Sequence, residues 1–472
     1  MKNFKKLASG ALALAMAGSM FAGCSPKTDS GATTAANKGT AASTGKVLNI
    51  WCWNDEFATR MLLVDGYTPT NKDKPLEGGK IGEVTVKFTQ VANTDNAYQD
   101  TLDKALDKQA TAAADDKIDL FLVEADYALK YVDTNYTVDV TQFVSKDDIA
   151  NQYKYTQEIM TDSNGVLKGL SWQACPGLLF YNREIAKEVL GSDDPATVQT
   201  YVSDWSKFQD TAKKMVDKGY LMEPSVNDSY RVYSNNVTKK WVVDKKIQID
   251  DNLKAWAEAS KAIYDMGGTK NVDLWGGYSN ATDGGCFCVF GPAWLINFCL
   301  GYQGNDPTAD LGVDDDGNKI VYNTSNVCNK GAWGACVGPQ SFYWGGTWMC
   351  AASGTDNASE ITKIMKSLTC DADTMKKIVT TYDDFVNNQA AMEAMAADTT
   401  YSSYVLGGMN PLGLYAEGAK KISLSNLTIY DQGCNETFQT AMEAYFEGKA
   451  TYDECLEAFY TSIQTKYPGL ER

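Results

Sequence analysis

The chain alternates strand-like and helix-like segments between residues 46 and 127, and this alternation limits the folds that it can adopt. Residues 46–53 and 84–88 predict strands, because apolar residues either predominate there or alternate with polar ones. Residues 98–114 predict a helix, and residues 118–123 predict a further, buried strand. Strands and helices joined by crossovers of this length form parallel sheets, so the sequence predicts an α/β fold.

Later segments predict further helices around more than one core. Trp205 and Trp256 lie on the apolar stripes of two predicted helices, and we assign both rings to the core. Two other helices are predicted to begin with capping boxes, at 357–360 and 451–454. With 472 residues the natural expectation is two or three domains. No internal repeat of about 20–50 residues is present, which argues against a solenoid or a propeller.

The N-terminus predicts export with a lipid anchor. Three lysines precede an apolar run at 7–20, which is too short and ends too abruptly for a membrane-spanning helix. Residues 21–24 then resemble the lipobox of bacterial lipoproteins, with Phe21 in place of the usual Leu. We therefore predict a lipoprotein signal peptide at 1–23 and lipidation of Cys24. An ordinary cleaved signal followed by a chance cysteine is the alternative.

Residues 24–46 predict a flexible tether. Beyond Cys24 they are almost all Ser, Thr, Ala, Gly, Lys, Asn, Asp and Pro, a composition that cannot bury enough apolar surface to order itself. Two acyl chains, at about 0.8 kcal/mol per buried CH₂, would anchor the protein stably without a spanning segment. We therefore expect a protein that is lipid-anchored at the extracellular face of the cell membrane.

Charge and composition exclude several classes of function. The chain has 60 acidic and 43 basic residues, a formal net charge of −17, which argues against nucleic acid as a partner. It has no histidine, which excludes Ser-His-Asp triads, Cys-His dyads and histidine-ligated metal centres. Any catalysis would have to use carboxylates, thiols, Lys or Tyr.

Of the 12 cysteines, 11 remain once Cys24 is set aside as the lipidation site. Several lie in apolar runs, which favours buried free thiols; one or two disulfides, or metal ligation, are the alternatives. The chain contains no Cys-x-x-Cys, and the acidic stretch at 314–318 departs from the EF-hand template. The sequence therefore predicts no metal site and no cofactor.

Several short segments occur in a characteristic order along the chain. After the lipobox and the tether they are Ile50-Trp-Cys-Trp-Asn54, 119–127, 172–182, 203–220, Gly291-Pro-Ala-Trp294, Tyr343-Trp-Gly-Gly-Thr-Trp348 and the helix start Gly448-x-x-Thr-x-x-Glu454. Together they resemble the extracellular sugar-binding lipoproteins of ABC importers, the family similar to maltodextrin-binding protein. The resemblance covers essentially the whole mature chain.

The resemblance implies a two-lobed, periplasmic-binding-protein-like α/β fold of type II, with a hinge and a cleft between the lobes. The family's chain crosses the hinge three times. Mapped onto this sequence, lobe one is expected at 47–174 plus 346–395, and lobe two at 175–345 plus 396–472. Residues 174–177 and 345–346 are expected crossings, because glycine accommodates large changes in φ and ψ.

A sugar site needs aromatic platforms for the apolar face of the ring, and carboxylates or amides for its hydroxyl rim. Trp53, Asn54 and Glu56 follow the first strand, and Asp126 and Tyr127 follow another strand. Parallel α/β sheets bind their ligands at these strand ends. The resemblance further implies that the acidic residue at the position of Asp126 binds sugar hydroxyls.

Other tryptophans are expected near the hinge. Trp172 precedes the first expected crossing, and Trp344 and Trp348 flank the second, so all three are predicted to face the cleft. Trp294 belongs to the Gly-Pro-x-Trp signature that supplies a stacking ring in the family, and the resemblance places Asn435 where the last segment lines the cleft. Packing in the core is the alternative for each ring.

The resemblance implies a monomeric, non-enzymatic substrate-binding protein that captures a neutral oligosaccharide and delivers it to the permease of an ABC transporter. A secreted glycoside hydrolase with a carboxylate pair is the alternative, since 60 acidic residues leave room for such a pair. A receptor for amino acids or peptides is a third hypothesis. An Arg–Asp pair that binds both ends of a zwitterion would favour it, but the chain has only four arginines, at 60, 183, 231 and 472, against 11 Trp, and this favours a neutral ligand.

Overall fold

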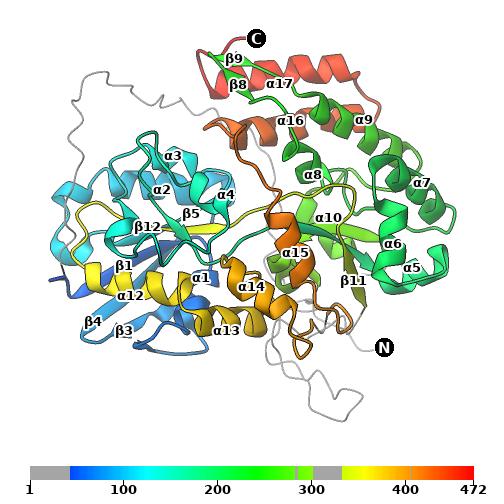
Figure 1. The fold of residues 1–472 in the computed structure, drawn as a ribbon. Coiled ribbons are helices and arrows are strands. Elements are labelled where there is room, and N and C mark those ends of the chain that lie inside the picture. Colours follow the sequence, from blue (N-terminus) through cyan, green and yellow to red (C-terminus); the bar gives the residue numbers. More distant parts are fainter. Residues whose placement is uncertain (1–42, 282–284, 301–331, 404) are drawn as a thin grey trace, which may run out of the picture.

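The computed structural model describes residues 43–281, 285–300, 332–403 and 405–472 (Figure 1). The predicted signal peptide, Cys24, most of the tether and residues 314–318 lie outside the described residues, so the predictions for them stay predictions. The last residues of the tether lie against the loop before helix α12 (Ala358–Thr369). Ser43 forms an isolated β-bridge with Asn357, and the backbone N–H of Thr44 donates to Asp356 O at 2.9 Å.

A mixed seven-stranded sheet has the strand order β2-β3-β4-β1-β5-β12-β6. β1 pairs in parallel with β4 and with β5, which confirms the parallel pairing predicted from the alternating sequence. The outer strands pair antiparallel with their neighbours. The bounds are β1 Val47–Cys52, β2 Tyr67–Pro69, β3 Gly79–Ile81, β4 Val84–Gln90, β5 Leu120–Glu124, β6 Leu170–Ser171 and β12 Thr347–Ala351.

A three-stranded antiparallel sheet has the order β10-β7-β11, with β7 Gly177–Asn182, β10 Cys288–Pro292 and β11 Trp333–Cys336. Two short strands, β8 Val242–Val243 and β9 Lys246–Ile247, pair separately. The chain passes from the large sheet to the small one between β6 and β7, and it returns between β11 and β12. Residues 174–177 and 345–346, where crossings are expected, lie at these two passages, and the hinge crossings and the lobe limits stay predictions.

The helices divide between the two sheets (Figure 1). We call the seven-stranded sheet with its helices the large-sheet lobe, and the three-stranded sheet with its helices the small-sheet lobe. The first group is α1 Glu56–Met61, α2 Ala97–Leu106, α3 Leu129–Val132, α4 Lys154–Glu158, α12, α13 Ala372–Tyr382 and α14 Gln389–Ala396. The second group is α5 Arg183–Leu190, α6 Pro195–Val202, α7 Trp205–Val216, α8 Tyr230–Ser234, α9 Asp251–Asp265, α10 Leu274–Asn280, α11 Ala293–Leu295, α16 Asp431–Phe446 and α17 Tyr452–Lys466. Helix α15 (Leu412–Ala419) lies between the two lobes in Figure 1.

Three buried clusters form the core. The largest fills the large-sheet lobe and continues onto the small sheet, so that Leu122 of β5 and Phe180 of β7 belong to one cluster. A second cluster lies on the other face of the small sheet, and the third joins α9 to α16 and α17. Trp256 is fully buried in the third cluster, as its helical stripe predicted, and Trp205 packs partly buried against it.

Two local predictions differ from the structure. Helix α2 ends at Leu106 instead of near residue 114, because Gln109 turns back to bond the backbone of Ile118, with Nε2 to O at 2.6 Å and Oε1 to N–H at 2.9 Å. Asn357 does not cap α12; its side-chain amide donates instead to Val47 O at 2.9 Å. The capping box predicted at the start of α17 is present.

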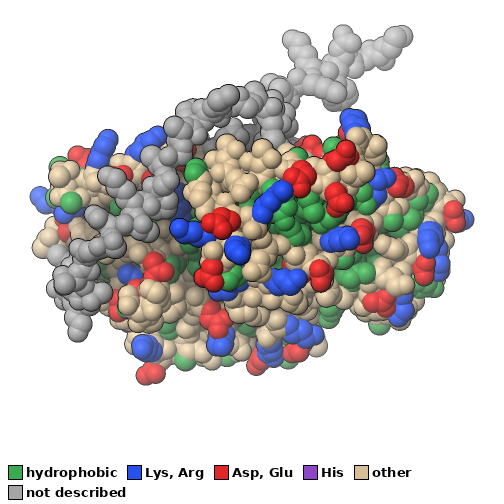
Figure 2. Space-filling model, turned by 90° about the horizontal axis from the view of Figure 1, so that it is seen from above, with side chains coloured by type: hydrophobic (Ala, Val, Ile, Leu, Met, Phe, Trp, Pro, Cys, Tyr) green, Lys and Arg blue, Asp and Glu red, His purple; other side chains and the backbone are tan. Residues whose placement is uncertain are grey.

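The ten cysteines that the structure describes are free, and all but Cys370 are buried. This confirms free thiols for those ten residues and burial for nine of them. Among the described helices none combines the length and the apolar character needed to cross a bilayer. On the face shown in Figure 2, acidic and basic side chains are interspersed instead of gathering into a patch of one sign.

Candidate functional site

The parallel strands β1 and β5 bring two groups of predicted site residues to one edge of the large sheet. Trp53 and Asn54 follow β1, and Asp126 and Tyr127 follow β5. The rings of Trp53 and Tyr127 lie 6.3 Å apart in an edge-to-face arrangement. Trp53 is partly exposed, whereas Tyr127 is buried, so Trp53 offers more ring surface to a ligand.

Asp126 forms an ion pair that joins the two lobes. Its two carboxylate oxygens accept hydrogen bonds from Nη1 and Nη2 of Arg231, each at 2.6 Å. Asp126 follows a strand of the large-sheet lobe, and Arg231 lies on α8 of the small-sheet lobe. The sequence predicted Asp126 as a site residue but not Arg231. The scarcity of arginine in this chain was the only sequence feature that could have drawn attention to Arg231.

The pair is fixed at both ends. The backbone N–H of Asp126 donates to Glu124 Oε2 at 2.7 Å, which ties its loop to the end of β5. The guanidinium carbon of Arg231 lies 5.6 Å from the ring centre of Trp344. About a quarter of each charged side chain is exposed, 27% for Asp126 and 23% for Arg231, so a ligand can reach both.

Aromatic side chains gather beside this ion pair. We call Trp275, Tyr278, Trp294 and Trp344 the aromatic cluster. Trp294 and Trp344 meet edge to face with ring centres 4.8 Å apart, and the indole N–H of Trp294 donates to Trp344 O at 3.1 Å. Trp275 lies 5.9 Å from Trp344 and 6.5 Å from Trp294. Such rings provide the flat apolar surfaces on which a sugar face can stack.

The structure brings the predicted Trp294 and Trp344 together and adds Trp275, which sequence reasoning did not select. Trp275 is 52% exposed, an unusual value for so large an apolar ring. No motif surrounds it, and its role follows only from its place in the cluster. Gly345 and Gly346 adopt φ angles of 73° and 115°, and a Cβ on Gly345 would lie 3.3 Å from Trp294 Nε1. The positive φ angles and this close contact favour glycine where the chain passes Trp294.

Two spaces with common lining residues lie at or near the ion pair. A small one, about 20 Å³, is lined by Asp126 and Arg231 together with Asn235, Tyr343 and Asp431, and Asn435 also borders it. A larger one, about 230 Å³, shares Asn235, Tyr343 and Asp431 with the first. We call the larger space the polar cavity.

Burial and neighbouring charge change the acidity of the carboxyl groups here. Burial, reinforced by the negative charge of Asp126, raises the pKa of Glu124 to about 8. Burial also raises the pKa of Asp431 to about 7, against the lowering effect of hydrogen bonds from Thr428. Glu124 is therefore mostly protonated at pH 7, and a protonated carboxyl can donate a hydrogen bond as well as accept one.

Glu56 lies in a different network, within the large-sheet lobe. Its Oε1 accepts from Gln173 Nε2 at 3.2 Å and lies 3.5 Å from Arg60 Nη2. Arg60 Nη2 also bonds Asp384 Oδ2 at 3.1 Å. Because these partners satisfy the buried carboxyl, we assign Glu56 to this network and not, as predicted, to the ligand site. Asn54 accepts from the backbone N–H of Glu56 at 3.2 Å, at the start of α1.

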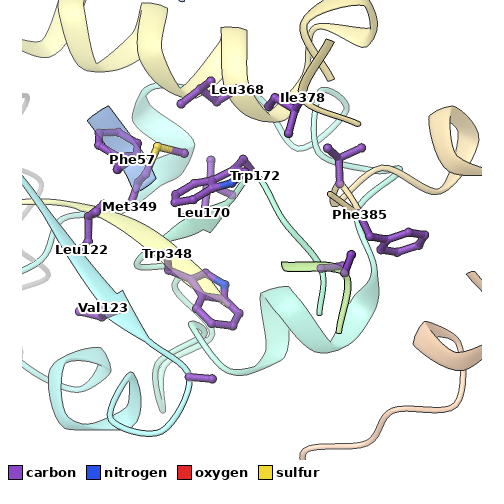
Figure 3. Packing of buried hydrophobic residues seen from close by; sticks show 14 of the residues in the cluster. Phe57, Leu122, Val123, Leu170, Trp172, Trp348, Met349, Leu368, Ile378 and Phe385 are labelled. Atoms are coloured by element: carbon purple, nitrogen blue, oxygen red, sulfur yellow. The ribbon is translucent and has the colours of Figure 1, made fainter. Parts of the chain in front are cut away.

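Trp172 and Trp348 are corrected in the same way. Their exposed fractions are 0% and 1%, and both rings lie inside the packed core of the large-sheet lobe (Figure 3). Trp172 packs against Phe57, with ring centres 5.5 Å apart, and the indole N–H of Trp348 donates to Thr156 O at 2.8 Å. Proximity to a crossing in sequence did not place either ring in the cleft, because each side chain points into the sheet packing.

The described ranges contain no cluster of three or more Cys, Asp or Glu side chains that is suited to a metal ion. Residues 314–318 lie outside those ranges.

Neither known family models nor curated proteins match this chain. Solved structures do. An extracellular solute-binding protein of family 1 superposes with a TM-score of 0.67 at 15% identity, covering 89% of this chain and 99% of the other. An ABC-transporter-associated binding protein from B. animalis subsp. lactis Bl-04, solved with β-1,6-galactobiose, gives 0.63 at 16% identity, covering 90% and 99%. The galacto-N-biose/lacto-N-biose I-binding protein of Bifidobacterium longum, solved with lacto-N-biose, gives 0.61 at 14% identity, covering 89% and 97%.

These similarities extend over nearly the full length of both chains, which confirms the predicted two-lobed, periplasmic-binding-protein-like α/β fold. The similar structures are binding proteins.

Proposed function

We propose that the protein is the substrate-binding component of an ABC importer and that it binds a neutral oligosaccharide between its lobes. The observation that carries this proposal is the Asp126–Arg231 ion pair beside Trp294 and Trp344. Charged hydrogen-bonding groups next to indole faces match the hydroxyl rim and the apolar face of a pyranose. The similar structures solved with galactobiose and with lacto-N-biose support the same ligand class.

The charges at the site favour an uncharged ligand. Arg231 and Asp126 neutralise each other, and the carboxyl group of Glu124 is mostly protonated at pH 7. No basic side chain other than Arg231 lines the small space within the described part of the chain. A sulfated or phosphorylated sugar would therefore find no unpaired cation in the small space.

The ligand-binding residues in this proposal are Asp126, Arg231, Trp53, Asn54, Tyr127, Trp275, Trp294 and Trp344. Ligand contacts to both lobes stabilise the closed arrangement, and a permease that recognises this arrangement would accept the loaded form. The proposal includes the lobe limits stated above, a lipid anchor at Cys24 on the outer membrane face, a monomeric state and no catalytic activity.

Calorimetric titration of the purified protein with a panel of neutral glycans tests the proposal. We expect heat and saturation with at least one di- or oligosaccharide, and the recovered sugar should be unchanged after incubation. Cleaved product would instead support the hydrolase alternative. Free amino acids and dipeptides belong in the same panel, because an Arg–Asp pair could also bind a zwitterion, and binding of these alone would overturn the carbohydrate proposal.

A further inference from the structure

The polar cavity is formed by three segments that are distant in sequence. It lies among the end of α8 with the residues after it, the crossing segment 341–343 and the segment 421–427 that precedes α16. Its volume is about 230 Å³. Pockets for drug-sized ligands measure roughly 300–1,000 Å³, so this cavity suits a smaller molecule or one unit of a longer one.

The lining is rich in hydroxyl and amide groups. Four serines contribute to it, at 234, 341, 423 and 425, together with Asn235, Asn236 and Asn426. Lys421 and Asp431 are the charged side chains along the lining, one of each sign. Groups that can both donate and accept hydrogen bonds are suited to an uncharged, hydroxyl-rich molecule.

Internal hydrogen bonds orient several of these groups and leave others for a ligand. Asn235 Oδ1 accepts from the backbone N–H of Tyr343 at 2.6 Å, and this bond does not use the amide N–H₂ group of Asn235. Asn426 Nδ2 donates to Val237 O at 2.8 Å, which leaves its carbonyl oxygen as an acceptor. Asp431 receives the Thr428 contacts on Oδ1, and its Oδ2 stays open. The cavity lining thus contains both donors and acceptors, several of which internal hydrogen bonds hold in place.

The cavity shares lining residues with the site described above. Asn235, Tyr343 and Asp431 line it and also line the small space at the Asp126–Arg231 pair. Arg231 in turn faces the ring of Trp344. Arg231 therefore faces one ring of the aromatic cluster and also lines the small space that shares residues with the polar cavity. A guanidinium has five N–H donors, and Asp126 occupies two of them, so Arg231 can also bond a ligand that spans the junction.

We propose that the polar cavity is a subsite for one uncharged, hydroxyl-rich unit of the ligand, and that a neighbouring unit stacks on the aromatic cluster. This inference rests on the proposed function and makes it more specific: the ligand has at least two sugar units, held on the two sides of the Asp126–Arg231 pair. One unit is recognised mainly by stacking and the other mainly by hydrogen bonds.

The test compares ligands of different length in a protein whose cavity is filled. Ser425 and Ser423 line the cavity but are exposed, so Ser425→Trp and, separately, Ser423→Trp can fill it without disturbing the core. Ser163→Trp is the matched control, because Ser163 is exposed in a loop of the large-sheet lobe. Thermal unfolding of each variant establishes that it is folded. Glucose, maltose, maltotriose, galactose and β-1,6-galactobiose are titrated calorimetrically into each protein.

We expect the wild-type protein and the Ser163→Trp control to bind a disaccharide or trisaccharide at least about tenfold more tightly than its monosaccharide. Two or three additional hydrogen bonds provide that difference. Filling the cavity should reduce this ratio to about threefold or less, while the monosaccharide affinity stays unchanged. The subsite is overturned if the folded variants keep the wild-type ratio, or if the wild-type protein shows no preference for length. Absence of binding to any sugar would overturn the proposed function itself, so the two failures are distinguishable.

Discussion

Two arginine–carboxylate networks in this molecule use the same chemistry in different places. Arg60 binds Glu56 and Asp384 inside the large-sheet lobe, with side chains that are 5%, 10% and 1% exposed. Arg231 binds Asp126 across the two lobes, and about a quarter of each side chain is exposed. The comparison shows that burial and location, and not residue type, separate a structural ion pair from a candidate ligand site.

Their ring neighbours differ as well. The guanidinium of Arg60 stacks on Tyr382 at 3.8 Å, and no side of it is left for a ligand. Arg231 faces Trp344 at 5.6 Å and borders an open space. We therefore expect changes in the first network to act on stability and changes in the second to act on ligand binding.

The largest effect should follow from Arg60→Met. The substitution leaves Glu56 and Asp384 buried without their cation, which costs about 3–5 kcal/mol in the free energy of unfolding. Denaturant unfolding at pH 7 measures the loss. Arg472→Met removes a solvent-exposed ion pair with Glu457 and should change stability little. Equal losses in the two variants would contradict the structural role of Arg60.

The second effect concerns affinity. Arg231→Gln removes charged hydrogen bonds from the junction and should weaken sugar binding about 10- to 100-fold, since such bonds contribute about 1.5–3 kcal/mol each. The free energy of unfolding should fall by only about 1 kcal/mol, because the pair is partly exposed. Titration and denaturant unfolding of the same preparation separate the two quantities. An affinity equal to that of the wild type would remove Arg231 from the site.

The two networks should differ in the pH range over which the free energy of unfolding depends on ionisation of their glutamate side chains. Burial raises the pKa of Glu56 to about 7 and that of Glu124 to about 8, whereas an unfolded Glu has a pKa of about 4.3. The folded state therefore binds more protons than the unfolded state inside each window, and stability falls as the pH rises through it. Glu56→Gln should gain stability relative to wild type from about pH 4.3 to about 7, and Glu124→Gln should continue to gain up to about pH 8.

Unfolding measured at intervals of pH checks this difference. Between pH 7 and 8 the advantage of Glu124→Gln over wild type should increase more steeply than that of Glu56→Gln, because the Glu56 carboxyl is already more than half ionised there. If the free energy of unfolding changed equally with pH in the two variants over that interval, the pKa values of the two carboxyl groups would not differ as the structure indicates.

The smallest effect is expected at the aromatic neighbour of the second network. Trp275→Ala removes an exposed ring of the aromatic cluster and should lower sugar affinity about two- to tenfold, equivalent to a stacking contribution of about 0.5–1.5 kcal/mol. Stability should be unchanged because the ring is half exposed. Ile429→Ala, at another exposed apolar residue, is the control. Equal affinities for the two variants would exclude Trp275 from the ligand surface.

The sequence predicted the parallel strand core well because its signals are local. Apolar runs and alternation located β1, β4 and β5 to within a few residues, and the polar residues that follow β1 and β5 do meet at one edge. The sequence-based prediction failed where a residue distant in sequence determines which hydrogen bond a side chain forms. Asn357 has the spacing of a capping box, but Val47 and Asp119 offer its amide better partners.

The candidate site could be predicted only in part, because only some of its residues have a local sequence signal. Trp294 belongs to a motif and Asp126 follows a strand, so both could be selected from the sequence. Trp172 and Trp348 lie next to crossings in sequence, yet their side chains point into the core, a direction that proximity in sequence does not determine. Arg231 and Trp275 carry no motif, and only the packing of the two lobes brings them to Asp126 and Trp344.

The most direct measurement is a parallel calorimetric titration of wild-type protein and Arg231→Gln with the tightest-binding glycan of the panel. We expect saturable heat from the wild-type protein and at least about tenfold weaker binding by the variant, which still unfolds close to the wild-type temperature. No heat from any glycan with the wild-type protein, or equal affinity in a folded variant, would contradict a carbohydrate site at the Asp126–Arg231 junction.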